Sequence, residues 1–407
     1  MKKLGFVIPW YSENITGGAE TELKGIVEHL AEKGTQLEVL TTCVEKFNSD
    51  WSKNYWQEGV EIINKINVRR FKVTGRNAKI FDEINSKLMA NQTVSTDEQK
   101  KFMKNFVNSP DLYKYIKTHQ NEYSLFVYIP YMFSINYYGM LECPEKSVLI
   151  PCFHEESYIH LDIYKNVIEK IAGLIYLSNP EKKLANKIFD LSNVKQAVLG
   201  AGVDTDFEYS SETFRNKYHL YEPFILYAGR KDVGKNIYLL IQYFEQYLKM
   251  HQGSKLKLVL MGGGKVVIPG RLKDKIIDLG YVDLQDKHDG CAAASVLCQP
   301  SVHESFSIVI MESWLGERPV LVHENCEVTK NFCKETNAGL WFGNYYEFEA
   351  ELDFILNNEN ISSQMGKNGR KYVVQNFSWD VISQKYMTFF NDLINIGENK
   401  HGTKANF

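Results

Sequence analysis

The segment 295–319 constrains the fold more than any other part of this 407-residue chain. Residues 295–300 form an apolar run with the length of a buried strand, and 308–315 form one with the length of a buried helix. Gly316 and Pro319 end that helix. A buried strand that turns directly into a buried helix is typical of α/β proteins, in which ligands bind where the strands end.

Two glutamates, Glu304 and Glu312, lie eight positions apart in this segment. If the helix begins near Ser305 or Ser307, its first N–H groups form an anion site. At about 1.5 Å per residue the glutamates are then about 12 Å apart along the axis, a length that suits a sugar, a pyrophosphate and a ribose. The alternative is a first-turn carboxylate and a solvated helix residue. We favour binding, because an unpaired carboxylate in a buried helix is costly.

These glutamates and the phenylalanine between them resemble the Glu-x7-Glu motif of retaining glycosyltransferases of family 4, which have the two-domain GT-B fold. The usual pattern, Glu-Gly-Phe-Gly-Leu, has glycines where this chain has Ser305 and Ser307, and leucine where it has Ile308. A serine still offers its N–H at a helix start, although its Cβ disfavours φ > 0. The resemblance implies a donor-binding segment made of Glu304, Ser305, Phe306, Ser307, Ile308 and Glu312.

A second strand-and-loop unit begins at 224–228 and carries the pair Arg230 and Lys235 before a helix. As a surface loop it would be unremarkable. Charge-assisted bonds from such a pair to a pyrophosphate are worth about 1.5–3 kcal/mol each. The spacing resembles the family's Gly-Arg-x4-Lys motif, which implies a clamp for the leaving phosphate. The glycine turn at Gly262 is a further candidate for donor binding. Residues 280–282 resemble a family segment whose backbone lies near the base, so Tyr281 is either a stacking partner of the base or a half-buried tyrosine.

The amino-terminal residues predict a nucleotide-binding type of opening. A strand at 4–8, a loop over 9–16, Gly17 and Gly18, a helix to about residue 33 and a strand at 37–42 follow in order. A Gly-Gly pair is also a common turn, so alone it is weak evidence. It resembles the family's Gly-Gly-Ala-Glu loop beside donor and acceptor. No Gly-x-Gly-x-x-Gly follows the first strand, which disfavours a dinucleotide oxidoreductase.

His154 follows an expected strand at 148–150. A histidine in this position is more often a packed polar residue than a catalytic one, but it matches the family's histidine that contacts the donor sugar. The family often has aspartate next, where this chain has Glu155. With the motifs above, the implied catalytic set is Glu304, His154, Arg230 and Lys235.

Two further clusters leave alternatives open. One is a basic patch, either a solvated face or a contact for anionic lipid headgroups, made of Arg69, Arg70, Lys72, Arg76 and Lys79. The other is aromatic, either core or a platform for an acceptor sugar, made of Tyr131, Phe133, Tyr137 and Tyr138.

Composition narrows the class of protein. The net charge of −3 gives no basic field that would favour nucleic acid as a partner. We expect no signal peptide, and no apolar stretch reaches the ~18 residues of a membrane span. Seven cysteines form no Cys-x-x-Cys pair, and Cys298 lies in an apolar run as a buried thiol. A cytoplasmic location, with the inner face of the membrane as an alternative, fits best.

The expected architecture is α/β, with two Rossmann-like domains facing across a cleft and a terminal helix that crosses back to the first. We place the first domain at 1–204, the nucleotide-sugar domain at 205–377 with a polar linker at 205–222, the returning helix at 378–396, and a disordered tail at 397–407. Neither a metal nor a cofactor is expected, because Asp286, His288 and Asp289 are too local for a metal site.

The resemblance covers nearly the whole chain and implies glycosyl transfer with retention, without a metal. The expected donor is a nucleotide-sugar, first a UDP- or GDP-sugar, and the acceptor a hydroxyl of a glycan or lipid-linked molecule in cell-surface polysaccharide synthesis. Alternatives are a GT-B-like sugar-nucleotide epimerase, a phosphorylase, and a non-catalytic sugar-binding subunit, which the two serine departures keep open.

Overall fold

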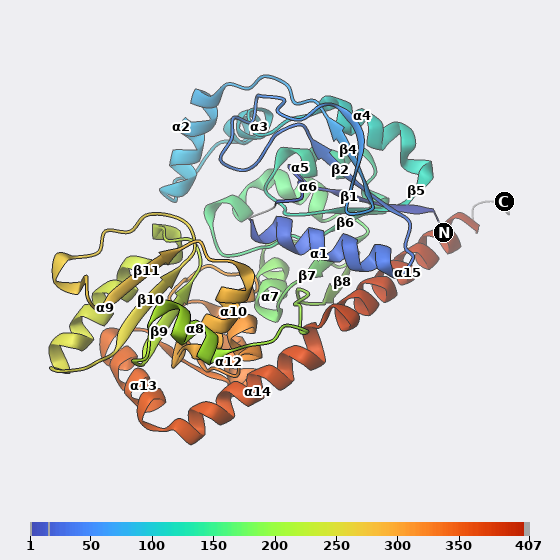
Figure 1. Cartoon of the computed structure of the whole chain (residues 1–407). Coiled ribbons are helices and arrows are strands. Elements are labelled where there is room, and N and C mark those ends of the chain that lie inside the picture. Colours follow the sequence, from blue (N-terminus) through green and yellow to red (C-terminus); the bar gives the residue numbers. More distant parts are fainter. Residues whose placement is uncertain (1, 15–16, 403–407) are drawn as a thin grey trace. The chain divides into compact units, whose positions relative to one another are not determined.

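The computed structural model describes residues 2–14 and 17–402 (Figure 1). The chain divides into two compact units, Met1–Gly202 with Ile382–Phe407, and Val203–Val381. Each is built on its own mostly parallel sheet flanked by helices. The predicted class, an α/β protein with two Rossmann-like units, is therefore confirmed.

The sheet of the first unit has eight strands in the order β3-β4-β2-β1-β5-β6-β7-β8. All neighbours are parallel except β3 and β4. The strands are β1 (Lys3–Val7), β2 (Leu37–Thr42), β3 (Gly59–Ile63), β4 (Ile66–Phe71), β5 (Tyr123–Tyr128), β6 (Ser147–Leu149), β7 (Gly173–Tyr176) and β8 (Lys195–Val198). Sequence order changes direction between β1 and β5, which is the place where open α/β sheets commonly form a crevice.

The helices of the first unit are α1 (Gly18–Glu32), α2 (Ala78–Met89), α3 (Thr96–Lys104), α4 (Pro110–His119), α5 (Ser134–Glu142), α6 (Lys165–Ile168) and α7 (Asn179–Ile188). The expected helical stretch over residues 79–117 is thus three helices. Local caps separate them: Asn77 caps α2, a Ser95–Glu98 capping box starts α3, and Pro110 opens α4.

The sheet of the second unit has six parallel strands in the order β11-β10-β9-β12-β13-β14. They are β9 (Phe224–Ala228), β10 (Lys257–Met261), β11 (Ile276–Gly280), β12 (Val296–Gln299), β13 (Val320–His323) and β14 (Gly339–Phe342). Numbered within the unit, this is the 3-2-1-4-5-6 order of dinucleotide-binding folds. The order reverses between β9 and β12.

The helices of the second unit are α8 (Ser211–Tyr218), α9 (Ile237–Met250), α10 (Leu284–Ala293), α11 (Ile308–Leu315), α12 (Glu327–Thr336), α13 (Tyr345–Asn357) and α14 (Glu359–Phe377). Helix α8 lies inside the stretch expected to be a polar linker. Its Phe214 is fully buried, and Arg215 donates to the Ala293 carbonyl at 2.6 Å. The stretch is therefore part of the packed unit, because one aromatic residue anchors it among polar neighbours.

The last helix, α15 (Trp379–Gly402), belongs to the first unit from Ile382 onward. Phe390 packs edge-on against Phe6 of β1, with ring centres 6.4 Å apart, and Lys195 pairs with Asp392 at 2.6 Å. The helix returns as the sequence predicts but continues past the expected end at residue 396, because a single glycine at 397 costs only ~1 kcal/mol in a helix. The remainder of the expected tail, 403–407, lies outside the described residues.

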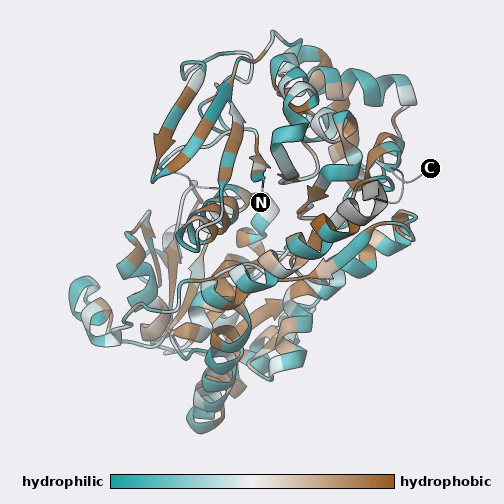
Figure 2. Cartoon of the chain, turned by 90° about the vertical axis from the view of Figure 1, so that its right-hand side faces the viewer, coloured by the Kyte–Doolittle hydropathy of each residue, from teal (hydrophilic) through white to brown (hydrophobic). Residues whose placement is uncertain are grey.

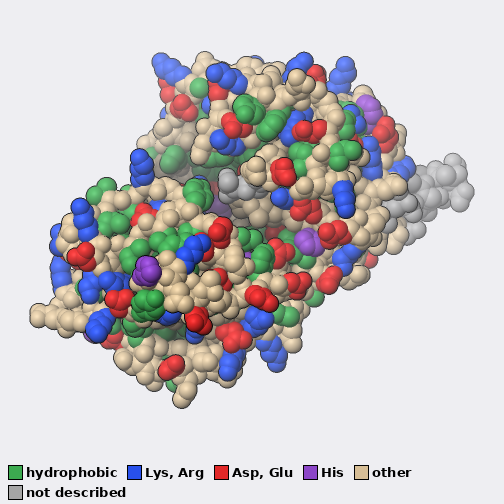
Figure 3. All heavy atoms as spheres, viewed as in Figure 1, with side chains coloured by type: hydrophobic (Ala, Val, Ile, Leu, Met, Phe, Trp, Pro, Cys, Tyr) green, Lys and Arg blue, Asp and Glu red, His purple; other side chains and the backbone are tan. Residues whose placement is uncertain are grey.

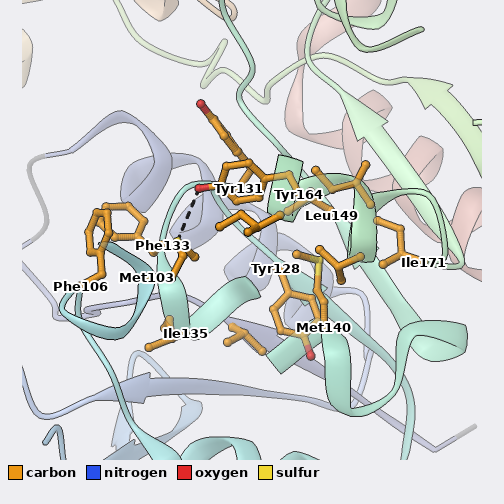
Figure 4. Packing of buried hydrophobic residues seen from close by; sticks show 14 of the residues in the cluster. Met103, Phe106, Tyr128, Tyr131, Phe133, Ile135, Met140, Leu149, Tyr164 and Ile171 are labelled. Atoms are coloured by element: carbon orange, nitrogen blue, oxygen red, sulfur yellow. Dashed lines mark hydrogen bonds between the residues drawn. The ribbon is translucent and has the colours of Figure 1, made fainter. Parts of the chain in front are cut away.

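The distribution of hydrophobic and hydrophilic residues agrees with this architecture. In Figure 2 the helices carry mixed hydrophobic and hydrophilic residues, as helices that cover a sheet do. Figure 4 shows part of the core of the first unit, where Tyr128, Tyr131 and Tyr164 pack among aliphatic side chains. On the face drawn in Figure 3, acidic and basic side chains are intermixed. No helix within the described residues has the length and apolar character to span a membrane.

Candidate active site

The candidate residues of the second unit gather at the reversal of its strand order. β9 ends at Ala228 and leads into the loop that carries Arg230 and Lys235, and β12 ends at Gln299 and leads into the loop with Glu304. Because the two strands are neighbours and parallel, their following loops emerge at the same edge of the sheet. This edge is where open α/β sheets bind ligands.

Lys235 and Glu304 form an ion pair at this edge. Lys235 Nζ lies 2.7 Å from Glu304 Oε1, and the two side chains are 23% and 10% exposed. The amide of Gln299 also donates to Glu304 Oε1, at 3.3 Å. The motifs predicted that the lysine and the glutamate share a site, but they did not indicate Gln299, whose only sequence signal is a polar residue at the end of a buried strand.

Arg230 lies apart from this pair. Its side chain is 66% exposed, and its Nε lies 3.4 Å from the carboxylate of Asp232. Asp232 in turn accepts from the backbone N–H of Lys235 at 3.0 Å, which closes the loop between the two cations. The loop therefore holds Lys235 in place and leaves the guanidinium of Arg230 available to a ligand in solution.

The helix start differs from the expected arrangement in one respect. α11 begins at Ile308, with Ser307 at its N-cap, so Glu304 lies before the helix and not on it. The estimate of about 12 Å between the glutamates assumed one continuous helix and does not apply. Ser307 adopts φ 74°, the left-handed conformation that disfavours a side chain, and its buried hydroxyl has no partner among the described residues. A glycine would fit this position without strain.

Two of the residues expected around the donor have different surroundings. Phe306 is 3% exposed and packs edge-on against Phe377 and Phe332, so its ring belongs to the core. Only its backbone can reach a ligand. Ile308 is partly buried at the first position of the helix.

Glu312 is buried in α11, as the apolar run predicts, and it is paired. Lys287 Nζ lies 2.5 Å from its Oε1, and His288 Nε2 lies 3.8 Å from the same atom. Burial alone would raise the pKa of Glu312, but the charge of Lys287 and the nearby His288 outweigh it and lower that pKa. Both partners come from α10, and no sequence pattern indicated this pairing.

Close packing between backbone groups holds the glycine turn at Gly262 in place. Gly262 has φ 112°, and a Cβ there would lie 2.2 Å from the Gly229 carbonyl oxygen, so only glycine fits. Its N–H donates to the carbonyl of Gly280 at 2.7 Å. Tyr281 follows, with 76% of the residue exposed, and its ring lies beside Gly263. An ion pair of the buried Lys231 with Asp278 ties the loop after β9 to strand β11.

In the first unit, Gly17 is the N-cap of α1 and Gly18 its first residue. The Glu20 side chain folds back over Gly17, where a Cβ would lie 1.9 Å from its Oε2. The indole of Trp10 donates to the same carboxylate. A Cβ at this position would push the Glu20 carboxylate aside, which its flexible side chain allows. Ile15 and Thr16, in the loop expected over 9–16, lie outside the described residues.

His154 follows β6 and is held through two neighbours. Its Nδ1 lies 3.2 Å from the Cys152 carbonyl oxygen, and its Nε2 lies 3.2 Å from Glu156, which accepts from the Tyr131 hydroxyl at 2.8 Å. Behind the loop, the buried carboxylate of Glu181 accepts from the N–H groups of Phe153 and Leu177. Sequence reasoning missed both glutamates, because Tyr131 bonds to Glu156 and Phe153 bonds to Glu181 from distant parts of the chain.

Tyr131 and Phe133 are buried, so the core interpretation of the aromatic cluster applies to them. Most of the expected basic patch is engaged within the unit. Arg70 is buried, with Glu61 as its partner, while Arg69 pairs with Glu38 and Lys72 with Glu58. These pairings leave little free positive charge for lipid headgroups.

Comparisons with known proteins agree with this geometry. Residues 210–372 match the family model described as glycosyl transferases group 1. The chain is 23% identical to an uncharacterised glycosyltransferase of Methanocaldococcus jannaschii, over 95% of this chain and 97% of that protein. It is 24% identical to the capsular polysaccharide biosynthesis glycosyltransferase CapM of Staphylococcus aureus, over 54% of this chain and 62% of that protein.

Solved structures share the fold. Sucrose-phosphate synthase from Thermosynechococcus elongatus matches with a TM-score of 0.70 and 17% identity, over 97% of this chain and 100% of that one. HepE of Anabaena, in complex with UDP-glucose, matches with a TM-score of 0.69 and 14% identity, over 96% and 100%. The fold is that of the GT-B glycosyltransferases, and residues 210–372, within the second unit, are similar to the group 1 glycosyltransferases.

Proposed function

We propose that this chain is a retaining glycosyltransferase that moves a sugar from a nucleotide-sugar to a hydroxyl of a glycan or lipid-linked acceptor. The ion pair of Lys235 with Glu304, at the reversal of strand order in the second unit, carries the proposal. A cation and a carboxylate at this edge suit a donor that has both phosphates and sugar hydroxyls.

The donor assignment follows the charges of the site. Arg230, Lys235 and the first N–H groups of α11, from Ser307 and Ile308, bind the diphosphate. Glu304 accepts from hydroxyls of the sugar, and Glu312 accepts from the ribose. These roles rest on the chemistry of each group and on the resemblance of the motifs.

The remaining candidates take supporting roles. Exposed Tyr281 stacks on the base, and the glycine turn at Gly262 lets the backbone approach the donor. In the first unit, His154 orients the sugar, with Glu156 setting the position of its ring. Gly17 and Gly18 give the donor and acceptor access to the start of α1.

The reaction breaks the bond between the anomeric carbon and the diphosphate oxygen, and forms one from the acceptor oxygen to the same face of that carbon. The proton of the acceptor hydroxyl passes to the leaving diphosphate. Lys235 and Arg230 stabilise the charge that grows on this leaving group, which is the largest demand of the transition state. Two cations in this position fulfil the task that a divalent ion performs in other transferases, so we propose metal-independent transfer.

The names of relatives suggest the biological setting. CapM is a capsular polysaccharide biosynthesis enzyme, and a further relative from S. aureus, 21% identical, is a poly(ribitol-phosphate) α-N-acetylglucosaminyltransferase. We therefore place the chain in cell-surface polysaccharide synthesis, acting in the cytoplasm or at the inner face of the membrane. HepE was solved with UDP-glucose, which makes UDP-sugars the first donors to test, with GDP-sugars next.

Thermal-shift screening of the chain against UDP-, GDP-, ADP- and dTDP-sugars identifies the donor, and turnover with acceptor glycans in excess EDTA then tests the reaction. We expect stabilisation by one base class and full, acceptor-dependent transfer with EDTA. Binding without turnover would instead indicate a sugar-binding subunit, conversion without an acceptor an epimerase, and activity that returns only with magnesium or manganese would contradict metal independence.

A further inference from the structure

Lys287 and Glu312 form an ion pair that the assignment of the donor site leaves unexplained. Lys287 Nζ lies 2.5 Å from Glu312 Oε1, and the side chains are 29% and 8% exposed. A buried ion pair is weak evidence of stability, because desolvation of the two charges offsets much of their attraction. Stability alone therefore does not account for the pair.

The surroundings of Glu312 offer few other charges. His288 lies 3.8 Å away, with its ring between Phe207 and Tyr209. Cys291 of α10 and the buried hydroxyl of Tyr209 also face the carboxylate, and both are neutral because burial raises their pKa. Other charged groups nearby are Asp204, whose charge also acts on Tyr209, and Arg370 of α14, whose guanidinium donates to the carbonyl of Leu315 and lies 3.8 Å from Glu317.

Among the described residues, Lys287 is therefore the permanent cation that pairs with Glu312. Its bond occupies Oε1 alone, and Oε2 makes no hydrogen bond to any side chain or backbone group in 2–14 and 17–402. The carboxylate thus has one oxygen fixed by protein and one free to accept.

We propose that Lys287 is a positioning residue for the nucleotide: it keeps Glu312 ionised and fixes one carboxylate oxygen, so that the other accepts from a ribose hydroxyl. The inference rests on the proposed role of Glu312. In a buried site without Lys287, the carboxyl would take up a proton as the pH falls. A neutral carboxyl is a weaker acceptor than a carboxylate, so binding of the nucleotide would then depend on pH.

The test compares Lys287→Gln with the wild type by calorimetric titration with UDP, and with GDP in parallel, at intervals from pH 5.0 to 8.5. The ratio of the two dissociation constants removes the ionisation of the diphosphate itself, which is common to both proteins. We expect the variant to bind a few-fold more weakly at pH 8.5 and at least tenfold more weakly at pH 5.0. A ratio that stays constant over this range overturns the inference.

Three controls separate charge from structure. Lys287→Arg keeps the charge and should give a flat ratio near one. Lys217→Gln removes another ion pair made by α10, that of Asp286 with Lys217 of α8 at 2.6 Å. This variant should also give a ratio that does not change with pH. In Lys287→Gln combined with Glu312→Gln the pH dependence should vanish, and a dependence that persists would overturn the inference.

The single variant Glu312→Gln tells the two ideas apart. If it leaves UDP and GDP affinity unchanged, the proposed role of Glu312 at the ribose is wrong. If it weakens binding while Lys287→Gln gives a flat ratio, the role of Glu312 stands and only the inference about Lys287 falls. Circular dichroism of each variant at each pH shows that the protein titrated is folded.

Discussion

The sheets of the two units both reverse their strand order but carry different chemistry at that place. In the second unit the reversal of strand order, between β9 and β12, holds the ion pair of Lys235 and Glu304. In the first unit the reversal lies between β1 and β5, and the loops after these strands meet through the rings of Trp10 and Phe133, 5.0 Å apart. The comparison shows that strand order sets where a crevice forms, while loop residues decide whether it is charged or filled.

Buried carboxylates show the same contrast. Glu312 of the second unit is paired with Lys287, and its pKa is lowered. Glu22 of the first unit is 3% exposed, and its oxygens make no hydrogen bond of normal geometry within the described residues. Burial raises the pKa of Glu22 to about 8, and the nearby Gly202 amide opposes this only in part. The difference lies in the partner and not in the unit as a whole, because Glu38 of the first unit is also buried and its pKa is lowered by Lys3, Tyr123 and Arg69.

The largest expected effect is on the stability of the first unit. Trp10 is 4% exposed and packs against Phe133 and Trp51. Trp10→Ala should lower the free energy of unfolding by about 3–5 kcal/mol, measured by urea denaturation with circular dichroism. Phe47→Ala, at the exposed edge of the same cluster, serves as control and should cost far less. Equal losses would mean that this crevice is not a packed core.

Lys235→Ala tests the second unit through catalysis. It should lower kcat about 10²- to 10³-fold and raise the donor KM much less, because the charge that Lys235 stabilises grows as the glycosidic bond breaks. Lys249→Ala removes an exposed ion pair with Glu245 on α9 and should change neither constant. A raised KM with unchanged kcat would show that Lys235 only binds the donor.

Substitution of Glu304 and substitution of Glu312 should have different effects on binding and transfer. Glu312→Gln should weaken binding of the free nucleoside diphosphate, and Glu304→Gln should leave that affinity nearly intact while it slows transfer. Each lost charge-assisted hydrogen bond is worth about 1.5–3 kcal/mol, roughly ten- to a hundredfold. Calorimetric titration of both variants decides the matter. The opposite pattern would place the donor in the reverse direction along this segment.

Glu22→Gln tests the protonated carboxyl of the first unit. The folded pKa of Glu22 is about 8 and the ordinary value is 4.5, so its stabilising contribution is complete below pH 4.5 and is lost as the pH rises through 8. From pH 5.5 to 7.5 the wild type should lose about 2 kcal/mol of stability relative to the variant. Glu312→Gln is the matched control. Its stability relative to the wild type should not change in this window, because the pKa of Glu312 is lowered and does not titrate there.

The smallest effect concerns the strained start of α11. Ser307→Gly should raise the free energy of unfolding by about 1 kcal/mol, because glycine adopts φ 74° without strain and the unpaired buried hydroxyl is removed. Thermal unfolding measures the gain. Ser305→Gly, at a position without positive φ, should give none. A loss of stability at Ser307 would show that its hydroxyl is bonded in solution.

Much of the fold was predictable, because apolar runs mark the buried strands, such as β5 and β9. β2 has the predicted bounds, 37–42, and β9 those of 224–228. Two predictions were wrong. The polar composition around α8 suggested a linker where the structure has a helix, and the motif suggested a continuous helix from Glu304 although α11 begins at Ile308. Propensity did not reveal that one serine adopts the left-handed conformation that ends the turn.

The sequence by itself determined the fold class, the family resemblance and the motif residues Glu304, Glu312 and Lys235, because these depend on local pattern and spacing. Only the tertiary structure decided their partners. Lys235 meets Glu304 across 69 positions, and Lys287 meets Glu312 across 25. Such pairs form between elements that strand order and helix packing bring together. The local hydrophobic periodicity of the sequence indicates neither pair. The charge state of a buried group depends on these partners, so it too is decided by the tertiary structure.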